Sequence, residues 1–137
     1  MKGATVLLNL TDLSDEPLQS QIARQIRAKI LAGDLAAGET LPSIRALARD
    51  ARVSVITVQR GYEDLEREGL IHSRRGKGFF VSELRGARRK QMARERLVAE
   101  LEPIVRDALS EGLTPPEIAA TFKTTVSKKA SDHDQSP

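Results

Sequence analysis

The chain has 137 residues, with 22 Lys or Arg against 19 Asp or Glu, and its formal net charge of +3 favours a nucleic-acid partner only weakly. It contains no cysteine, which excludes disulfides and thiolate metal sites, and no apolar run approaches the roughly 18 residues of a membrane-spanning helix. Aromatic side chains are limited to one Tyr and three Phe, which argues against base stacking on single-stranded nucleic acid. We therefore expect a cytoplasmic protein without membrane segments.

Residues 1–15 are predicted to form an N-terminal arm, and its β-rich segment Thr5–Leu10 is compatible with a short strand. A first helix is predicted after the arm, because Pro17 suits the first helical position and Gly33 suits the end. Its apolar residues recur at every fourth position and form one stripe, which we expect to be buried. These residues are Leu18, Ile22, Ile26 and Ile30.

A short second helix is predicted from residue 44, after a loop that covers residues 34–42. Ser43 suits the N-cap of this helix. The reciprocal Glu of a capping box is missing, because position 46 is Ala. The residues expected to face inward are Leu41, Ile44, Leu47 and Ala48.

The third predicted helix, Val55–Glu68, begins with four β-branched residues, a type that slightly disfavours helices. Ser54 suits its N-cap, and Gly69 suits its left-handed end. The first half of the helix carries no acidic residue. The acidic residues lie in the second half, at Glu63, Asp64, Glu66 and Glu68. Phosphates would repel that half, so only the N-terminal half is expected to approach DNA.

Two short β-runs follow, residues 70–73 and 79–82, and the turn between them contains the sequence RRGKG with three positive charges. This pattern predicts a hairpin. The order of helix, short helix, tight turn, helix and charged hairpin over residues 16–82 is typical of a winged helix-turn-helix. In such a domain the second helix of the pair lies in the major groove, with its N-terminal residues at the base edges.

The uncharged start of the third helix is therefore predicted to be an exposed reading surface. Val55 and Ile56 suit apolar contact with thymine methyl groups. Thr57 suits a base edge or a phosphate, and Gln59 suits a bidentate contact with adenine. Arg60 lies one step round the helix and is expected at a phosphate. The residue types leave open the alternative that Val55 and Ile56 belong to the core.

Residues 17–81 resemble the DNA-binding domain of the GntR family of bacterial transcription regulators. Three motifs carry this resemblance in the order and spacing of the family: LPSIRALA, VSVITVQRGYEDLEREGLI and RRGKGFFV. The short tail resembles the YtrA-like branch, whose members have the smallest C-terminal parts. The resemblance implies DNA-binding roles for Ser43 and Arg45 of the LPSIR motif, for Ser54 in the turn, and for Arg75, Gly76 and Lys77 in the hairpin.

The chain departs from the family at two positions that usually hold arginine. These positions are occupied by Val55 and Gln59. The guanine readers that the family uses most often are therefore absent, since arginine is the side chain that pairs bidentately with guanine. We expect an operator that need not resemble those of other branches.

Residues 83–125 are predicted to form a helical dimerisation region. One helical period runs from Arg88 to Leu109 and passes through Pro103 without a change of phase, which predicts a single helix that bends at the proline. Its apolar stripe needs a partner, and a two-fold homodimer is the commonest solution. The expected interface residues are Met92, Leu97, Leu101, Ile104, Val105 and Ala108.

The last part of the chain is predicted to hold one more short helix. Residues 114–117, TPPE, have the capping-box spacing with a proline in the first turn. The polar residues 126–137 are expected to be disordered. Larger members of the family append a ligand-binding domain after the hairpin, and this tail has no room for one. No small-molecule effector is expected, although a site at the dimer interface stays open.

These observations predict an α+β, mainly helical protein that binds double-stranded DNA as a homodimer and represses transcription from a palindromic operator. Two alternatives stay open: a winged-helix module that binds proteins, and a DNA-binding protein without sequence preference. No enzyme or cofactor is expected, because the sequence has no nucleophile–base–acid set and no glycine-rich phosphate loop. No metal site is expected either, because His72 and His133 have no partners at ligand spacing.

Overall fold

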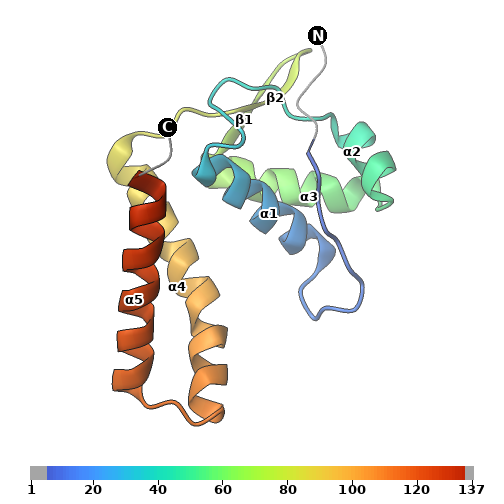
Figure 1. Cartoon of the computed structure of the whole chain (residues 1–137). Helices are drawn as coiled ribbons and strands as arrows, with labels where there is room; N and C mark the ends of the chain where they lie inside the picture. The colour runs from blue at the N-terminus through green and yellow to red at the C-terminus, as the bar shows by residue number, and fades with distance from the viewer. Residues whose placement is uncertain (1–5, 135–137) are drawn as a thin grey trace. The chain divides into compact units, whose positions relative to one another are not determined.

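The computed structural model describes residues 6–134, and contacts divide the chain into two compact units, residues 1–90 and 91–137. Figure 1 shows the order of the elements along the chain. The elements are α1 (Leu18–Ala32), α2 (Ile44–Ala51), α3 (Val55–Arg67), β1 (Ile71–Arg74), β2 (Gly78–Val81), α4 (Gly86–Ser110) and α5 (Pro115–Asp134). The predicted class, α+β and mainly helical, is confirmed.

The first unit is built on the contact between α1 and α3. Ile22 and Ile26 of the predicted stripe are fully buried on α1. On α3, a side chain at Gly61 would place its Cβ 3.2 Å from the main-chain oxygen of Gln19 and 3.1 Å from Ile22 Cγ2. The absence of a side chain therefore lets the two helices approach closely. Pro17 is the N-cap of α1 rather than its first residue, and Gly33 ends it in the left-handed conformation as predicted.

The hairpin forms as predicted, with β1 and β2 antiparallel and Ile71 paired with Val81. The loop before α2 also pairs with β2, which the sequence did not indicate. The Val81 N–H donates to the Glu39 carbonyl over 2.9 Å, and the Leu41 N–H donates to the Phe79 carbonyl over 2.9 Å. This loop therefore connects the hairpin to the start of α2 by hydrogen bonds.

Tyr62 ties α3 to the segment before α2. Its ring is fully buried and lies edge-on to Phe79, with 5.1 Å between the ring centroids. Its hydroxyl donates to the Pro42 carbonyl over 2.7 Å. Burial raises the pKa of the Tyr62 phenol, so it stays a neutral hydrogen-bond donor.

The expected strand in the N-terminal arm is wrong for residues 6–10, which form no regular element, and Thr5 lies outside the described residues. The backbone of the arm makes its hydrogen bonds with side-chain amides of α1 and not with a neighbouring strand. The Asn9 N–H donates to Gln25 Oε1 over 2.8 Å, and Gln25 Nε2 donates back to the Asn9 carbonyl over 2.8 Å. Gln21 makes the same pair of bonds with Thr11 and a further bond to the Glu16 carbonyl.

The first turn of α4 is fastened to the ends of two other helices. The Arg88 guanidinium donates to the Glu68 carbonyl at the end of α3 over 2.7 Å. The Arg89 guanidinium donates to the Leu31 carbonyl at the end of α1 over 2.8 Å. Positive charge at the start of α4 opposes its own dipole but complements two helix C-termini. The contact division accordingly falls after residue 90, and the predicted domain boundary after residue 82 stays a prediction.

The two helices of the second unit are both longer than predicted. α4 continues through Pro103 as one helix, as expected, and the bend at this proline stays a prediction. α5 continues to Asp134, so the expected disorder is wrong for residues 126–134, while residues 135–137 lie outside the described part. Within this polar helix the hydroxyls of Thr121 and Thr125 donate to the carbonyls one turn earlier.

The predicted capping box at the start of α5 is confirmed. The Thr114 N–H donates to Glu117 Oε1 over 2.9 Å, and the Glu117 N–H donates to Thr114 Oγ1 over 3.3 Å. The hydrogen bonds from the backbone and hydroxyl of Thr114 hold the pKa of the Glu117 carboxyl below its usual value. This box satisfies two of the backbone groups that a helix N-terminus would otherwise leave free.

We predict that Gln21→Ala lowers the free energy of unfolding by about 1–3 kcal/mol, because it leaves the Thr11 backbone and the Glu16 carbonyl without partners. Chemical denaturation would measure this loss, and limited proteolysis should cut residues 6–16 faster in the variant. The matched control is Gln19→Ala on the same helix, whose side chain makes no hydrogen bond among the described residues. An equal loss in both variants would show that the arm is not held by Gln21.

Candidate nucleic-acid interface

The two helices of the helix-turn-helix begin at serine caps. Ser43 Oγ accepts a hydrogen bond from the Ala46 N–H over 3.1 Å, and Ser54 Oγ accepts one from the Thr57 N–H over 3.1 Å. Both predicted caps are confirmed. The hydroxyls of Ser54 and Thr57 also lie 2.7 Å apart, so they are oriented towards each other at the start of α3.

The N-terminal half of α3 presents apolar side chains to solvent. Val55 is 46% exposed and Ile56 is 51% exposed, whereas Val58 is fully buried. The alternative that Val55 and Ile56 are core residues is therefore excluded. Gln59 and Arg60 are exposed as well, and Gln59 Nε2 donates to Glu63 Oε1 over 3.2 Å. The start of α3 is thus an uncharged surface with one amide beside it.

The acidic side chains of the C-terminal half of α3 take part in bonds within the first unit. Asp64 pairs with Arg67 at 2.9 Å, one turn further along the helix. Just beyond α3, Glu68 accepts two hydrogen bonds from the Arg27 guanidinium of α1. Glu66 accepts a bond from the Ser73 hydroxyl of β1 over 3.2 Å. This half of α3 therefore serves the fold rather than a ligand.

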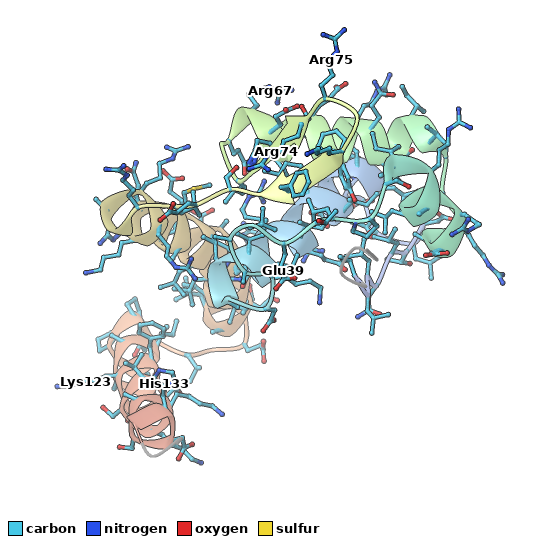
Figure 2. All side chains as sticks on the ribbon, turned by 90° about the horizontal axis from the view of Figure 1, so that it is seen from above. Glu39, Arg67, Arg74, Arg75, Lys123 and His133 are labelled. Carbon is cyan, nitrogen blue, oxygen red and sulfur yellow. The ribbon has the colours of Figure 1, made fainter. Side chains whose placement is uncertain are left out.

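The turn of the hairpin is a basic tip. Arg75, Gly76 and Lys77 are all exposed, and Gly76 has a φ of 74°, which favours glycine. Figure 2 shows Arg75 extending outward from the tip, away from the ribbon. Arg74 differs, because its guanidinium lies 5.0 Å from the centroid of the Phe80 ring and is held there.

Apart from Arg88 and Arg89, which bind backbone carbonyls, two groups of basic side chains can be distinguished in the first unit. One group forms ion pairs within the unit, and its members are Arg24, Arg27, Arg49 and Arg67. The other group makes no side-chain hydrogen bond or ion pair among the described residues. The predicted DNA contacts belong to this second group: Arg45, Arg60, Arg75 and Lys77. The structure thus leaves these cations available to an anionic partner.

The second unit carries an apolar surface on α4. A groove of about 400 Å³ is lined by Val98, Leu101, Glu102, Val105, Arg106 and Leu109. Two of the predicted interface residues, Leu101 and Val105, belong to this lining. Ile104 is 62% exposed and Leu97 is 48% exposed, while Ala108 is half-buried.

Met92 lies on a different face of α4 from the groove, and its place in the dimer interface stays a prediction. Its side chain is 7% exposed within the single chain. Nine residues separate it from Leu101, which is two and a half turns at 3.6 residues per turn. Met92 therefore lies on the opposite side of α4.

No group of three or more His, Asp or Glu side chains within residues 6–134 could hold a metal ion. Over the same residues, no helix is long and apolar enough to cross a membrane.

Comparison with known proteins identifies the class. The family model described as bacterial regulatory proteins, gntR family, matches residues 18–81. The chain is 36% identical over 112 residues to YhcF of Bacillus subtilis, an HTH-type transcriptional regulator, and this covers 81% of the chain and 91% of YhcF. It is 36% identical over 77 residues to the HTH-type transcriptional repressor YtrA of the same organism, covering 56% of the chain and 59% of YtrA.

Two solved structures extend the similarity into the tail. A GntR-family transcriptional regulator from Listeria monocytogenes superposes with a TM-score of 0.69 and 29% identity, covering 84% of this chain and 98% of that one. YtrA from Sulfolobus acidocaldarius superposes with a TM-score of 0.53 and 32% identity, covering 88% of this chain and 97% of that one.

The winged helix with its free basic side chains defines a DNA-binding transcription regulator and not an enzyme. The chain belongs to the GntR family, and within the family it belongs to the YtrA-like branch.

We predict that Arg45, Arg75 and Lys77 act through phosphates. Replacing any one of them with Ala should weaken binding to every duplex by a similar factor and flatten the dependence of log K on log salt by about 0.9. Fluorescence anisotropy at several salt concentrations would measure both effects. The control is Arg67→Gln, which removes an exposed arginine that is paired with Asp64. A variant with changed sequence preference and an unchanged salt slope would contradict the phosphate role.

Proposed function

We propose that this chain is a cytoplasmic, sequence-specific repressor that binds a palindromic operator as a homodimer. The observation that carries the proposal is the exposed N-terminal half of α3, which has no acidic residue and carries the free cation Arg60. The acids of the other half are bound within the fold. A helix end of this kind is suited to the major groove, where base edges are distinguished by hydrogen bonds and methyl contacts.

The side chains on this surface favour base recognition over binding without sequence preference. Val55 and Ile56 offer apolar area to thymine methyl groups, and Gln59 offers the amide pair that matches adenine. The hydrogen bond from Gln59 to Glu63 is long and exposed, so reorienting the amide towards a base costs little. A protein that packs DNA without preference needs only cations at this place, because phosphates supply non-specific affinity.

Phosphate contacts would set the position of α3 in the groove. Ser43 and Arg45 lie at the start of α2, which precedes α3 in the sequence. The basic tip of the hairpin follows α3. Contacts of this kind fix register and orientation without reading sequence. The interpretation as a module that binds proteins is less favoured, because it gives no role to the free cations.

The homodimer is supported by the apolar surface of α4. The groove is lined by Leu101, Val105 and their neighbours, and Ile104 beside it is 62% exposed, so the apolar side chains of α4 form one continuous stripe that a partner could cover. Two copies related by a two-fold axis would cover each other's groove and present two reading helices to inverted half-sites. Repression is supported by the relative YtrA, which is named a transcriptional repressor.

We predict that Gln59→Ala weakens binding to the operator by about 1–3 kcal/mol and relaxes one base position in each half-site. The operator itself would come from selection of random duplexes by the unmodified protein, where we expect an inverted repeat. Glu63→Ala is the control, because it removes the partner of Gln59 but leaves the amide free to read a base. Equal loss on operator and random DNA would show that Gln59 reads no base. Failure to enrich any sequence would refute sequence-specific binding.

We further predict that Leu101→Glu combined with Ile104→Glu gives monomers that bind half-sites weakly, because two carboxylates would be buried in the interface. Analytical ultracentrifugation would give the mass in solution. The control combines Ala99→Glu with Ser110→Glu, which places the same charge on exposed positions on the opposite side of α4. A double variant at residues 101 and 104 that stays dimeric would exclude the proposed interface.

A further inference from the structure

The turn between α2 and α3 contains an unusual residue, Arg52. Its φ of 57° is in the left-handed region, and it ends α2 as the C-cap. The other positive-φ positions of residues 6–134 are all glycines, such as Gly33 and Gly69. A side chain with a Cβ is disfavoured in this conformation, and glycine adopts it without penalty. The fold alone would therefore be better served by glycine at this position.

The guanidinium of Arg52 is exposed and belongs to the group of free cations. It makes no side-chain hydrogen bond or ion pair among the described residues. Asp50, the nearest acid in the sequence, is already paired with Arg49 at 3.3 Å. In this respect Arg52 resembles Arg45 and Arg60, the free cations on α2 and α3, rather than the paired arginines of the unit.

Arg52 also lies at the end of α3 that is proposed to approach DNA. Only Val53 and Ser54 separate it from Val55, the first residue of the helix. The N-terminus of a helix attracts phosphate through its dipole and its free N–H groups. Arg52 adds a fork of donors to this end, and a guanidinium matches the oxygens of a phosphate well.

We infer that Arg52 binds a phosphate of the DNA backbone beside the half-site, through its guanidinium and from the left-handed turn between α2 and α3. This inference rests on the proposed function and adds to it a contact at a position where the fold would prefer glycine. Because the contact is made to the backbone, it raises affinity on every sequence and leaves the base preference unchanged.

The test compares Arg52→Asn with Arg52→Lys. Asparagine tolerates the left-handed conformation, so Arg52→Asn should keep the midpoint of thermal unfolding or raise it. We expect this variant to lose affinity for operator and random duplexes by the same factor, about 8-fold at about 0.1 M salt, and to flatten the salt slope by about 0.9. Arg52→Lys keeps the charge and should keep the slope. Arg67→Gln, which removes a paired arginine, should leave affinity and slope unchanged.

Two results would overturn the inference. One is that Arg52→Asn binds both duplexes with the affinity and slope of the unmodified protein. The other is that its loss is confined to the operator, which would indicate a base contact. Failure of the proposed function would look different. In that case the unmodified protein itself would bind no duplex, or would bind all duplexes equally. Thermal unfolding of each variant separates a lost contact from a lost fold.

Discussion

The close packing of α3 against α1 is the constraint on which the rest of the structure depends. Gly61 lets the backbone of α1 approach α3, and the fully buried Ile22 packs against it. This packing decides which face of α3 is buried, and therefore which residues are left for solvent. The two apolar residues at the start of the helix, Val55 and Ile56, are exposed because they lie beyond the contact with α1.

Electrostatic pairing then divides α3 along its length. Asp64, Glu66 and Glu68 are bound by arginines and a serine of the same unit, so these acids stabilise the fold. The link between Arg27 and Glu68 joins α1 to the end of α3, and Arg88 binds the carbonyl of the same Glu68. The start of α4 is thus attached to the unit that holds the reading surface.

Most local signals in the sequence were reliable, and the error in the N-terminal arm came from contacts between distant residues. The caps at Ser43 and Ser54 and the hairpin were predicted correctly, because each depends on residues within one turn or one hairpin. The arm was predicted as a possible strand, yet its hydrogen bonds go to Gln21 and Gln25 of a helix. Met92 was included in the helical period of the stripe, although nine residues at 3.6 residues per turn place it on the opposite side of α4 from Leu101.

By itself, the sequence determined the class of the protein. Its helix periods, caps, glycine turns and basic hairpin are local patterns, and together they define a winged helix-turn-helix with a helical tail. Tertiary structure alone decided three further points: that Val55 and Ile56 are exposed, that the start of α4 belongs to the first unit, and that the side chain of Arg52 has no hydrogen bond or ion pair among the described residues. The physical reason is that the type of a residue does not determine which side chains it contacts in the folded protein. Burial and pairing depend on residues far apart in the chain that only folding brings together.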